Sequence, residues 1–426
     1  MSRELDVFIE SERAGRLYEN LGIWSFDYDA DWRATGYPLA PGLPLRAEAI
    51  VDTGSERPVQ WFFDNLLPEE MARTRLIAAL EKGEWDAWRL LERYGGESAG
   101  ALTLLKPGET LPPPSLAPLT DARLHARIQA MPHIPLGENA PKKMSLAGAQ
   151  EKLPVFMDKA GQLFDPVGSQ LSTHILKPNA LSERYPASAV NEWFCARVAQ
   201  EMGLNVPPVT LHYAPSCVYL IERFDRVWDN GTLRRRHALD AVQLLSLSAG
   251  SKYTMSGVRA LNDVVALCRV KAQTRIALFR WALFNVLIGN GDAHLKNLSL
   301  FAGRDGYALA PHYDLVSTAA WARPELTPHG ATWPNIELSF PFGDAALFGQ
   351  IRREHVFQFA EALGVPAVTV SRELARMLGG IETAAEKMMA EFAELTVPPA
   401  QRPGQLHMLR VIRHLPIKDM KSRLSV

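Results

Sequence analysis

Three consecutive prolines, Pro112 to Pro114, interrupt the chain about a quarter of the way along its length. Proline fixes its own φ angle and has no backbone N–H to donate, so neither a helix nor an inner strand continues through such a run. The surrounding stretch, Lys106 to Thr120, is therefore the clearest linker in the sequence. Because 426 residues suffice for two or three domains, each with its own core, we expect the first domain boundary here.

The composition is that of a soluble globular protein, with 47% apolar and 22% charged residues. The formal net charge is −1, so the chain as a whole has no electrostatic attraction to nucleic acid or to an anionic membrane. Any contact with DNA must then come from a local patch or from a partner protein.

Several features predict a cytoplasmic protein. The first residues, Met1 to Asp6, carry acids where a signal peptide needs an apolar stretch. The most apolar helical segment, Ile276 to Ile288, is too short to span a bilayer and is interrupted by Arg280 and Asn285. An odd number of cysteines in apolar runs predicts buried thiols in a reducing compartment: Cys195, Cys217 and Cys268.

The patterning along the chain predicts strands first and helices later. Strand-like or glycine-turn segments are expected at residues 5–9, 24–28, 93–105, 144–158 (strand–turn–strand), 172–177 and 206–225 (two strands). Helices are expected near 65–73, over 121–130 and 187–202, and through most of 239–394. A proline-rich break at 397–403 precedes a basic terminal helix, which is most simply a solvated face or an internal cap, and alternatively a contact for acidic protein surface or DNA phosphates.

The most informative segment is the polar stretch from Gly289 to Leu300, which directly follows the apolar helix. It holds the acid Asp292 and, five residues later, the amide Asn297. Phosphoryl transfer to a hydroxyl needs a carboxylate that accepts the proton and a separate oxygen ligand for magnesium on the same loop. This spacing matches the catalytic loop of protein kinases, although the usual His-Arg before the acid is missing.

A second acid follows after a predicted hairpin of two short strands. Asp314, within Pro311-His-Tyr-Asp-Leu, is a candidate for the second magnesium ligand. Either motif alone also fits a polar loop that caps a helix or closes a turn. The two together, in this order, favour a kinase.

Upstream segments supply candidate partners for a nucleotide. Lys177 ends a β-branched strand, from which it would reach phosphates, and Glu192 on the following helix would hold it by an ion pair. Tyr219 to Asp225 lies where a hinge would offer backbone groups to adenine. A lone lysine on a strand is usually solvated, and the hinge segment equally fits an ordinary strand that ends in a charged turn.

The expected phosphate-covering loop departs from the usual pattern. No G-x-G-x-x-G precedes Lys177, and no Walker A motif occurs in the chain. Instead, Ser145 to Pro154 contains one glycine with small neighbours, which would let backbone N–H groups approach a phosphate.

Five ordered segments resemble the successive motifs of the HipA-type toxin kinases: 145–152, 173–178, 222–226, 291–297 and 313–314. Phe62 to Glu69 and Ser98 to Leu104 also resemble the small N-terminal domain of that family. The resemblance runs from about residue 5 to beyond residue 390 and implies an α+β fold. In that fold a β-rich N-terminal domain (1–110) precedes an atypical two-lobed protein-kinase-like fold, with an N-lobe (121–230) and an all-helical C-lobe (231–426).

The resemblance also implies roles for individual residues. Asp292 would be the catalytic base, and Asn297 and Asp314 would bind Mg²⁺. Ser145 would be autophosphorylated, which would expel the nucleotide loop and switch the kinase off. ATP contacts are implied for Ala147, Gly148, Ala149, Gln150, Glu151, Lys152, Lys177, Glu222, Arg223, Phe224, His294, Leu295, Lys296, Asn297, Tyr313 and Asp314.

The implied partners are a small helix-turn-helix antitoxin similar to HipB, operator DNA mainly through that antitoxin, and a protein substrate. Glutamyl-tRNA synthetase is a target within the family, but targets vary among its members. No membrane partner is expected. Two alternatives stay open: a small-molecule or lipid kinase of related fold, and an inactive scaffold for a DNA-binding antitoxin. The Ser145 loop favours the toxin over the first, and intact Asp292, Asn297, Asp314 and Lys177 count against the second.

Overall fold

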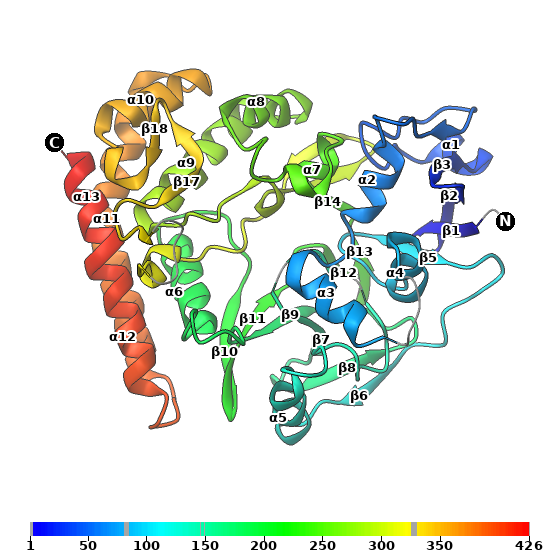
Figure 1. The fold of residues 1–426 in the computed structure, drawn as a ribbon, viewed down its shortest axis with the longest axis horizontal. Coiled ribbons are helices and arrows are strands. Elements are labelled where there is room, and N and C mark those ends of the chain that lie inside the picture. The colour runs from blue at the N-terminus through cyan, green and yellow to red at the C-terminus, as the bar shows by residue number, and fades with distance from the viewer. Residues whose placement is uncertain (1–2, 81–84, 145, 149, 325–329, 426) are drawn as a thin grey trace. The chain divides into compact units, whose positions relative to one another are not determined.

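The chain forms two units, each assembled from separated stretches of sequence (Figure 1). This computed structural model describes residues 3–80, 85–144, 146–148, 150–324 and 330–425. Unit 1 comprises Met1–Lys177, Ile221–Lys252 and Ser299–Ala310. Unit 2 comprises Pro178–Leu220, Tyr253–Leu298 and Pro311–Val426.

Unit 1 begins with a five-stranded antiparallel sheet in the order β4-β3-β2-β1-β5. Its strands are β1 (Arg3–Ile9), β2 (Glu12–Asn20), β3 (Ile23–Tyr28), β4 (Ile50–Val51) and β5 (Leu102–Leu105). Alternation of apolar residues gives the sheet one buried face. Helices α2 (Pro58–Asp64) and α4 (Ala87–Tyr94) pack there, with Phe63 against Phe26 and Trp88 against Trp24. The strands predicted at 5–9 and 24–28, and the strand after the glycine turn, are confirmed.

A second group of strands in unit 1 has the order β9-β7-β8-β6. These are β6 (Ser115–Pro118), β7 (Leu153–Met157), β8 (Leu163–Val167) and β9 (His174–Pro178). Two predictions need correction. The end of the predicted linker is the edge strand β6, which pairs with β8. Of the described residues in 144–158, those before β7 form no strand, so the first of the two predicted strands is wrong; Gly148 there has φ +110°, which is not extended.

The rest of unit 1 consists of short elements. The helices are α1 (Ala30–Thr35), α3 (Glu70–Ala78), α5 (Asp121–Ala130) and α7 (Ala241–Leu244). The strands are β12 (Arg226–Asp229), β13 (Thr232–Arg235), β14 (Ala238–Asp240), β15 (Ser299–Gly303) and β16 (Gly306–Leu309). The predicted hairpin before Pro311 is confirmed as β15–β16, and helix α5 has the predicted bounds, with Thr120 accepting from the Arg123 N–H as its cap.

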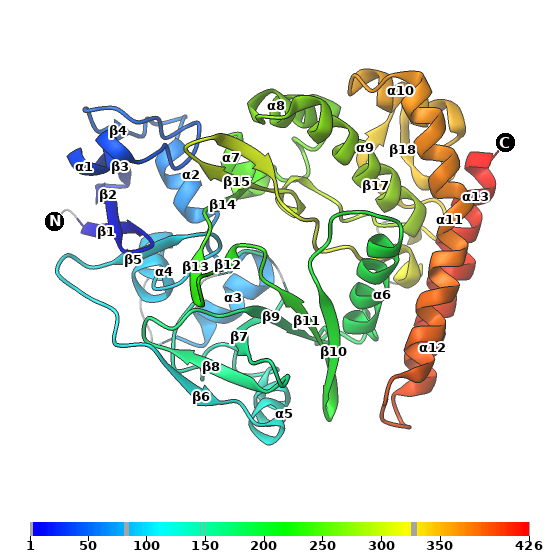
Figure 2. The same ribbon diagram turned by 180° about the vertical axis from the view of Figure 1, so that it is seen from behind.

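Unit 2 is mainly helical, and its helix α6 lies beside α11 and α12 (Figure 1, Figure 2). Its helices are α6 (Ser188–Glu201), α8 (Val258–Leu267), α9 (Lys271–Ile288), α10 (Arg353–Ala362), α11 (Ala367–Glu394), α12 (Arg402–Ile412) and α13 (Lys418–Ser425). Strand β10 (Val209–Ala214) is followed by β11 (Ser216–Glu222), which ends at the boundary with unit 1. A hairpin of β17 (Glu337–Phe342) and β18 (Ala345–Leu347) makes the C-terminal part predominantly rather than entirely helical.

The basic terminal segment is largely engaged within unit 2. Arg413 and Lys421 pair with Glu386 and Glu382 on α11, and Arg423 pairs with Asp419. These pairs support an internal cap for the part of the tail that they involve.

All three cysteines are buried thiols, as predicted. Within the described ranges, no helix combines the length and the apolar character needed to cross a membrane.

Candidate active site

The loop that carries Asp292 begins where α9 ends at Gly289. Gly289 adopts φ 67° and ψ 45°, the left-handed conformation that terminates many helices and that glycine adopts without strain. A Cβ atom here would lie 2.6 Å from the Cβ of Ala319. Glycine is therefore required both for the turn and for the close approach of the following segment.

Side chains of the same unit fix the backbone of this loop. The Asn290 amide donates to Asn285 Oδ1 (2.8 Å) and accepts from the Asp292 N–H (3.0 Å). The Gly291 N–H donates to Thr318 Oγ1 (2.8 Å). The loop is thus held in one conformation from both sides before Asp292 is reached.

Asp292 and Asn297 are joined by a direct hydrogen bond within the loop. The Asn297 Nδ2 donates to the backbone oxygen of Asp292 at 2.7 Å. The Asp292 side chain is 52% exposed, whereas Asn297 is buried. The loop thus engages the amide nitrogen of Asn297, and the amide oxygen is the atom of this side chain that would bind a metal.

The segment that carries Asp314 is tied to the same loop. The Tyr313 hydroxyl donates to the Lys296 backbone oxygen at 2.7 Å, so the neighbours of Asp314 and Asn297 are in contact. Asp314 has φ 52°, an uncommon value for a residue other than glycine, and such values cluster at functional sites. Asp292, Asn297 and Asp314 therefore belong to two joined segments of unit 2.

The remaining residues expected on this loop are buried: His294, Leu295 and Lys296. The His294 N–H donates to the Asp292 oxygen at 2.9 Å, and its ring meets that of Tyr253 edge-on at 4.8 Å. In the described part of the chain, no group of three or more His, Cys, Asp or Glu residues could hold a metal ion.

An amide and a carboxylate are a suitable donor set for magnesium. Mg²⁺ prefers oxygen ligands, keeps several waters, and is usually bound by one or two protein oxygens together with substrate phosphates. Asn297 and Asp314 would supply this set.

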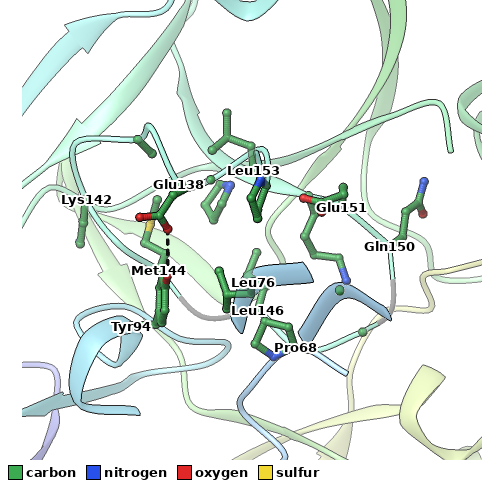
Figure 3. Close-up of a pocket in the computed structure, with 17 residues that line it drawn as sticks. Pro68, Leu76, Tyr94, Glu138, Lys142, Met144, Leu146, Gln150, Glu151 and Leu153 are labelled. Atoms are coloured by element: carbon green, nitrogen blue, oxygen red, sulfur yellow. Dashed lines mark hydrogen bonds between the residues drawn. The ribbon is translucent and has the colours of Figure 1, made fainter. Parts of the chain in front are cut away.

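The expected nucleotide loop lies in unit 1, where Ser145 and Ala149 fall outside the described residues. The Glu69 N–H donates to the Gly148 oxygen at 3.2 Å, and Lys152 Nζ donates to the Ala147 oxygen at 2.6 Å. Gly148 also lines a pocket of about 70 Å³. Figure 3 shows this pocket with Pro68, Leu76, Leu146, Gln150 and Glu151 around it. The segment before α3 therefore supports this loop.

Two lysines occupy the same end of a strand pair in unit 1. Leu153 on β7 pairs with Leu176 on β9 in antiparallel register. Lys152 and Lys177 are each one residue further toward the same end, so they lie across from each other. Two cations at one strand end suit the binding of phosphate groups. Glu192 is buried on α6 in unit 2, so its ion pair with Lys177 stays a prediction.

The side chain of Arg223, a residue of the predicted hinge, is buried in a network of charges. Its five N–H donors bond to Asp225 Oδ1 and Oδ2, Ser98 O, Ser172 Oγ and Glu97 Oε1 at 2.7 to 3.3 Å. No donor is left for a ligand. Of the hinge residues, Glu222 is exposed and Phe224 packs edge-on against Phe301, so a ligand contact at this segment is expected through the backbone.

Glu97 is not among the predicted site residues, yet it lies at the centre of this network. It accepts from Lys142 Nζ (2.7 Å), Arg226 Nη2 (2.9 Å) and Arg223. We call Glu97, Lys142, Arg223, Asp225 and Arg226 the Glu97 cluster. In the sequence, the cluster is marked by an acid that lies between Gly96 and Gly100. Gly100 is required there because a Cβ atom would lie 2.5 Å from the Ala238 oxygen.

The charges of the Glu97 cluster shift one another's ionisation. Burial by itself raises the pKa of Asp225, but Arg223 and Arg226 outweigh it and lower that pKa to about 2. Burial likewise opposes ionisation of Glu97, yet Arg226, Lys142 and Arg223 hold its pKa well below the usual range. These pairs favour the ionised carboxylates of Glu97 and Asp225, and the cluster joins residues 97–100, 142, 172 and 223–226 inside unit 1.

Comparison with known proteins defines the class of protein to which this fold belongs. Residues 5–105 match the HipA N-terminal domain, and residues 144–393 match the HipA-like C-terminal domain. The chain belongs to the HipA family of toxin kinases.

Named relatives agree with this assignment. The chain is 33% identical over 416 residues to the putative kinase Y4mE of Sinorhizobium fredii, covering 94% of this chain and 95% of that protein. It is 33% identical over 309 residues to the serine/threonine-protein kinase toxin HipA of Shewanella oneidensis, covering 68% and 69%. A structure of the Shewanella oneidensis MR-1 HipA–HipB–operator DNA complex contains a chain with a TM-score of 0.81 and 26% identity, covering 99% of this chain and 97% of that one.

Proposed function

We propose that this protein is an ATP- and magnesium-dependent kinase toxin that phosphorylates serine or threonine in a protein substrate. The observation that carries the proposal is the Asp292–Asn297 hydrogen bond, which ties the buried amide of Asn297 to the backbone of the residue that bears the exposed carboxylate. Kinase chemistry depends mainly on positioning and on electrostatic stabilisation, and both require such a fixed loop.

Each candidate residue has a task in this proposal. Asp292 orients the acceptor hydroxyl and takes its proton, while the oxygens of Asn297 and Asp314 hold the metal. Lys152 and Lys177 bind phosphate oxygens, and the backbone at Glu222 and Phe224 meets adenine. When bound, Mg²⁺–ATP supplies the phosphoryl group and neutralises the charge that develops on it.

The proposal extends to partners and organisation. The HipA chain of the Shewanella complex is bound to HipB and operator DNA, so we propose a HipB-like helix-turn-helix antitoxin for this chain, with DNA bound mainly through it. We also propose a cytoplasmic location, an aminoacyl-tRNA synthetase as a candidate substrate, and the division into 1–110, 121–230 and 231–426.

Removal of the proposed base tests the catalytic assignment. Asp292→Asn keeps the shape of the side chain but cannot accept a proton, so phosphate transfer to casein should fall by at least about 100-fold. Phosphate transfer by Asp314→Ala should fall by a comparable factor, and a higher Mg²⁺ concentration should not restore it. The matched control is Asp263→Asn, an exposed position on α8 that should keep wild-type rates. Near-normal turnover in folded Asp292→Asn protein would refute the assignment.

The acceptor class is tested with the wild-type protein. Phosphate transfer to casein, with none to sugar or lipid acceptors, supports a protein kinase. The reverse preference would favour the small-molecule or lipid kinase. Binding of an antitoxin without any phosphotransfer would favour the inactive scaffold.

Autophosphorylation of Ser145 is part of the proposal. A phosphoserine adds close to two negative charges, and the two lysines before it are already engaged, Lys142 with Glu97 and Lys143 with Glu138. The added charge should therefore repel the phosphates of ATP rather than find a partner. Peptide mapping after incubation with Mg²⁺ and ATP should find phosphate on Ser145 in wild-type protein and none in Asp292→Asn. An unmodified Ser145 in active protein would contradict this step.

A further inference from the structure

Tyr253 makes a hydrogen bond to the side chain of Asp292. The tyrosine is 46% exposed and lies in unit 2, in the turn before α8. Its hydroxyl donates to Asp292 Oδ1 at 2.6 Å. Its ring meets the buried ring of His294 at 4.8 Å with an interplanar angle of 84°. One side chain therefore contacts both the proposed base and the residue two positions beyond it.

The turn that carries Tyr253 is fixed to the same loop at a second point. The Tyr253 backbone oxygen accepts from the Ser256 N–H at 2.9 Å. The Ser256 hydroxyl in turn accepts from the Leu295 N–H at 3.2 Å. The turn therefore contacts the loop at two points, Tyr253 with Asp292 and Ser256 with Leu295. Because these contacts restrict the position of Tyr253, its hydrogen bond to the carboxylate costs little conformational entropy.

A half-exposed carboxylate rotates readily about its terminal bond unless a donor holds one oxygen. A phenol is a neutral donor at physiological pH, and a hydrogen bond to an ionised acceptor is among the stronger ones in proteins. A base that orients an acceptor hydroxyl gains from such restraint, because a small misplacement of the reacting groups slows transfer.

We propose that Tyr253 is a positioning residue for phosphotransfer: its hydroxyl holds Asp292 Oδ1 so that the second carboxylate oxygen is presented to the acceptor hydroxyl. The inference rests on the proposed role of Asp292 as the base. A competing arrangement, in which the phenol occupies the place of the acceptor and blocks Asp292, predicts a change of rate in the opposite direction.

The variant Tyr253→Phe keeps the ring on His294 and removes only the hydroxyl. We expect kcat for phosphate transfer to casein to fall about tenfold, the range of one hydrogen bond to a charged group, with KM for ATP and the melting temperature unchanged. The matched control is Tyr185→Phe, which alters another exposed tyrosine of unit 2 whose ring meets Trp321 edge-on at 5.4 Å. Its kcat should equal that of the wild type.

A double variant separates this inference from the proposed function. If the hydroxyl acts through Asp292, Tyr253→Phe should cause no further loss in the Asp292→Asn background. An unchanged or raised kcat in Tyr253→Phe, or an equal fall in Tyr185→Phe, would overturn the positioning role while Asp292 remains the base. If Asp292→Asn itself keeps wild-type activity, the proposed function fails instead.

Discussion

The side chain of Asn191 on α6 pairs with both backbone groups of Ser317, three residues after Asp314. Its Nδ2 donates to the Ser317 oxygen at 3.0 Å, and its Oδ1 accepts from the Ser317 N–H at 2.8 Å. Both residues are fully buried. The segment that carries the proposed metal ligand is therefore anchored to a helix by one amide.

The variant Asn191→Ala would leave both backbone groups of Ser317 buried without this partner. We expect the free energy of unfolding to fall by about 1 to 3 kcal/mol, the usual cost of such groups. Because Asp314 would then be less well fixed, half-maximal activity should require more Mg²⁺. Urea denaturation and a magnesium titration of casein phosphorylation measure the two effects.

The matched control is Asn262→Ala, which removes a hydrogen bond to the Ala362 oxygen in an exposed setting. Its stability should change by less than about 1 kcal/mol and its magnesium requirement should not change. A loss of stability in Asn191→Ala with an unaltered magnesium requirement would show that this anchor does not act on the metal site.

The variant Glu97→Gln would remove the anion at the centre of the Glu97 cluster. Lys142, Arg223 and Arg226 would remain buried without the carboxylate that pairs with them, so we expect the free energy of unfolding to fall by about 3 kcal/mol or more. Urea denaturation of the folded variant provides the measurement. Glu109→Gln, an exposed acid that accepts from the Lys106 N–H, is the control and should be close to neutral. Equal stability of both variants would mean that the cluster is not a structural element.

Local patterns in the sequence were sufficient to predict many of the helices and strands of the fold. The patterning predicted strands at 5–9 and 24–28, where β1 and β3 lie, and a helix over 187–202, where α6 lies. Strand β6 was missed because its pairing with β8 depends on residues about fifty positions away, which no local pattern contains.

The candidate site shows the same limit. The spacing of Asp292 and Asn297 indicated a shared loop, and the structure joins them through a hydrogen bond. Arg223 has the same local sequence whether its side chain meets a ligand or Glu97, and only the tertiary structure distinguishes the two. Tyr253 carries no motif, because its role depends on a contact with Asp292 that spans 39 positions.

Stability should fall steeply below pH 6.5 because two histidines are buried as neutral rings. Burial lowers the pKa of His237 and of His312 from 6.5 to about 4. As pH falls from 6.5 to about 4, the unfolded chain binds protons that the folded chain does not, so each histidine lowers the free energy of unfolding. The slope is about 1.4 kcal/mol per pH unit for each. Urea denaturation at a series of pH values tests this.

The variant His237→Gln keeps an amide donor near the Leu39 oxygen, which the ring contacts at 3.0 Å, but does not titrate. In this variant, the part of the pH dependence of the unfolding free energy that the two histidines contribute should fall by about half. The exposed His133, changed to Gln, is the control and should leave the slope unchanged. A profile that is flat between pH 7 and pH 4.5 in the wild type would contradict the prediction.

Lys252 forms ion pairs with Glu69 and Glu70, at the start of α3, where the chain contacts the nucleotide loop. Its Nζ donates to Glu69 Oε2 at 3.0 Å and to Glu70 Oε1 at 2.6 Å, and both Lys252 and Glu69 are buried. Glu69 also donates its backbone N–H to the Gly148 oxygen. An ion pair within unit 1 therefore holds the residue on which the described part of the nucleotide loop rests.

The variant Lys252→Met would keep the length of the side chain but leave the Glu69 carboxylate buried without this cation. We expect a loss of about 3 kcal/mol in the free energy of unfolding and a higher KM for ATP, because Glu69 would no longer fix Gly148. The control is Lys106→Met, which breaks an exposed pair with Glu92 worth at most about 1 kcal/mol and should leave KM unchanged. Reduced stability with an unchanged KM for ATP would show that Lys252 supports the fold without holding the nucleotide loop.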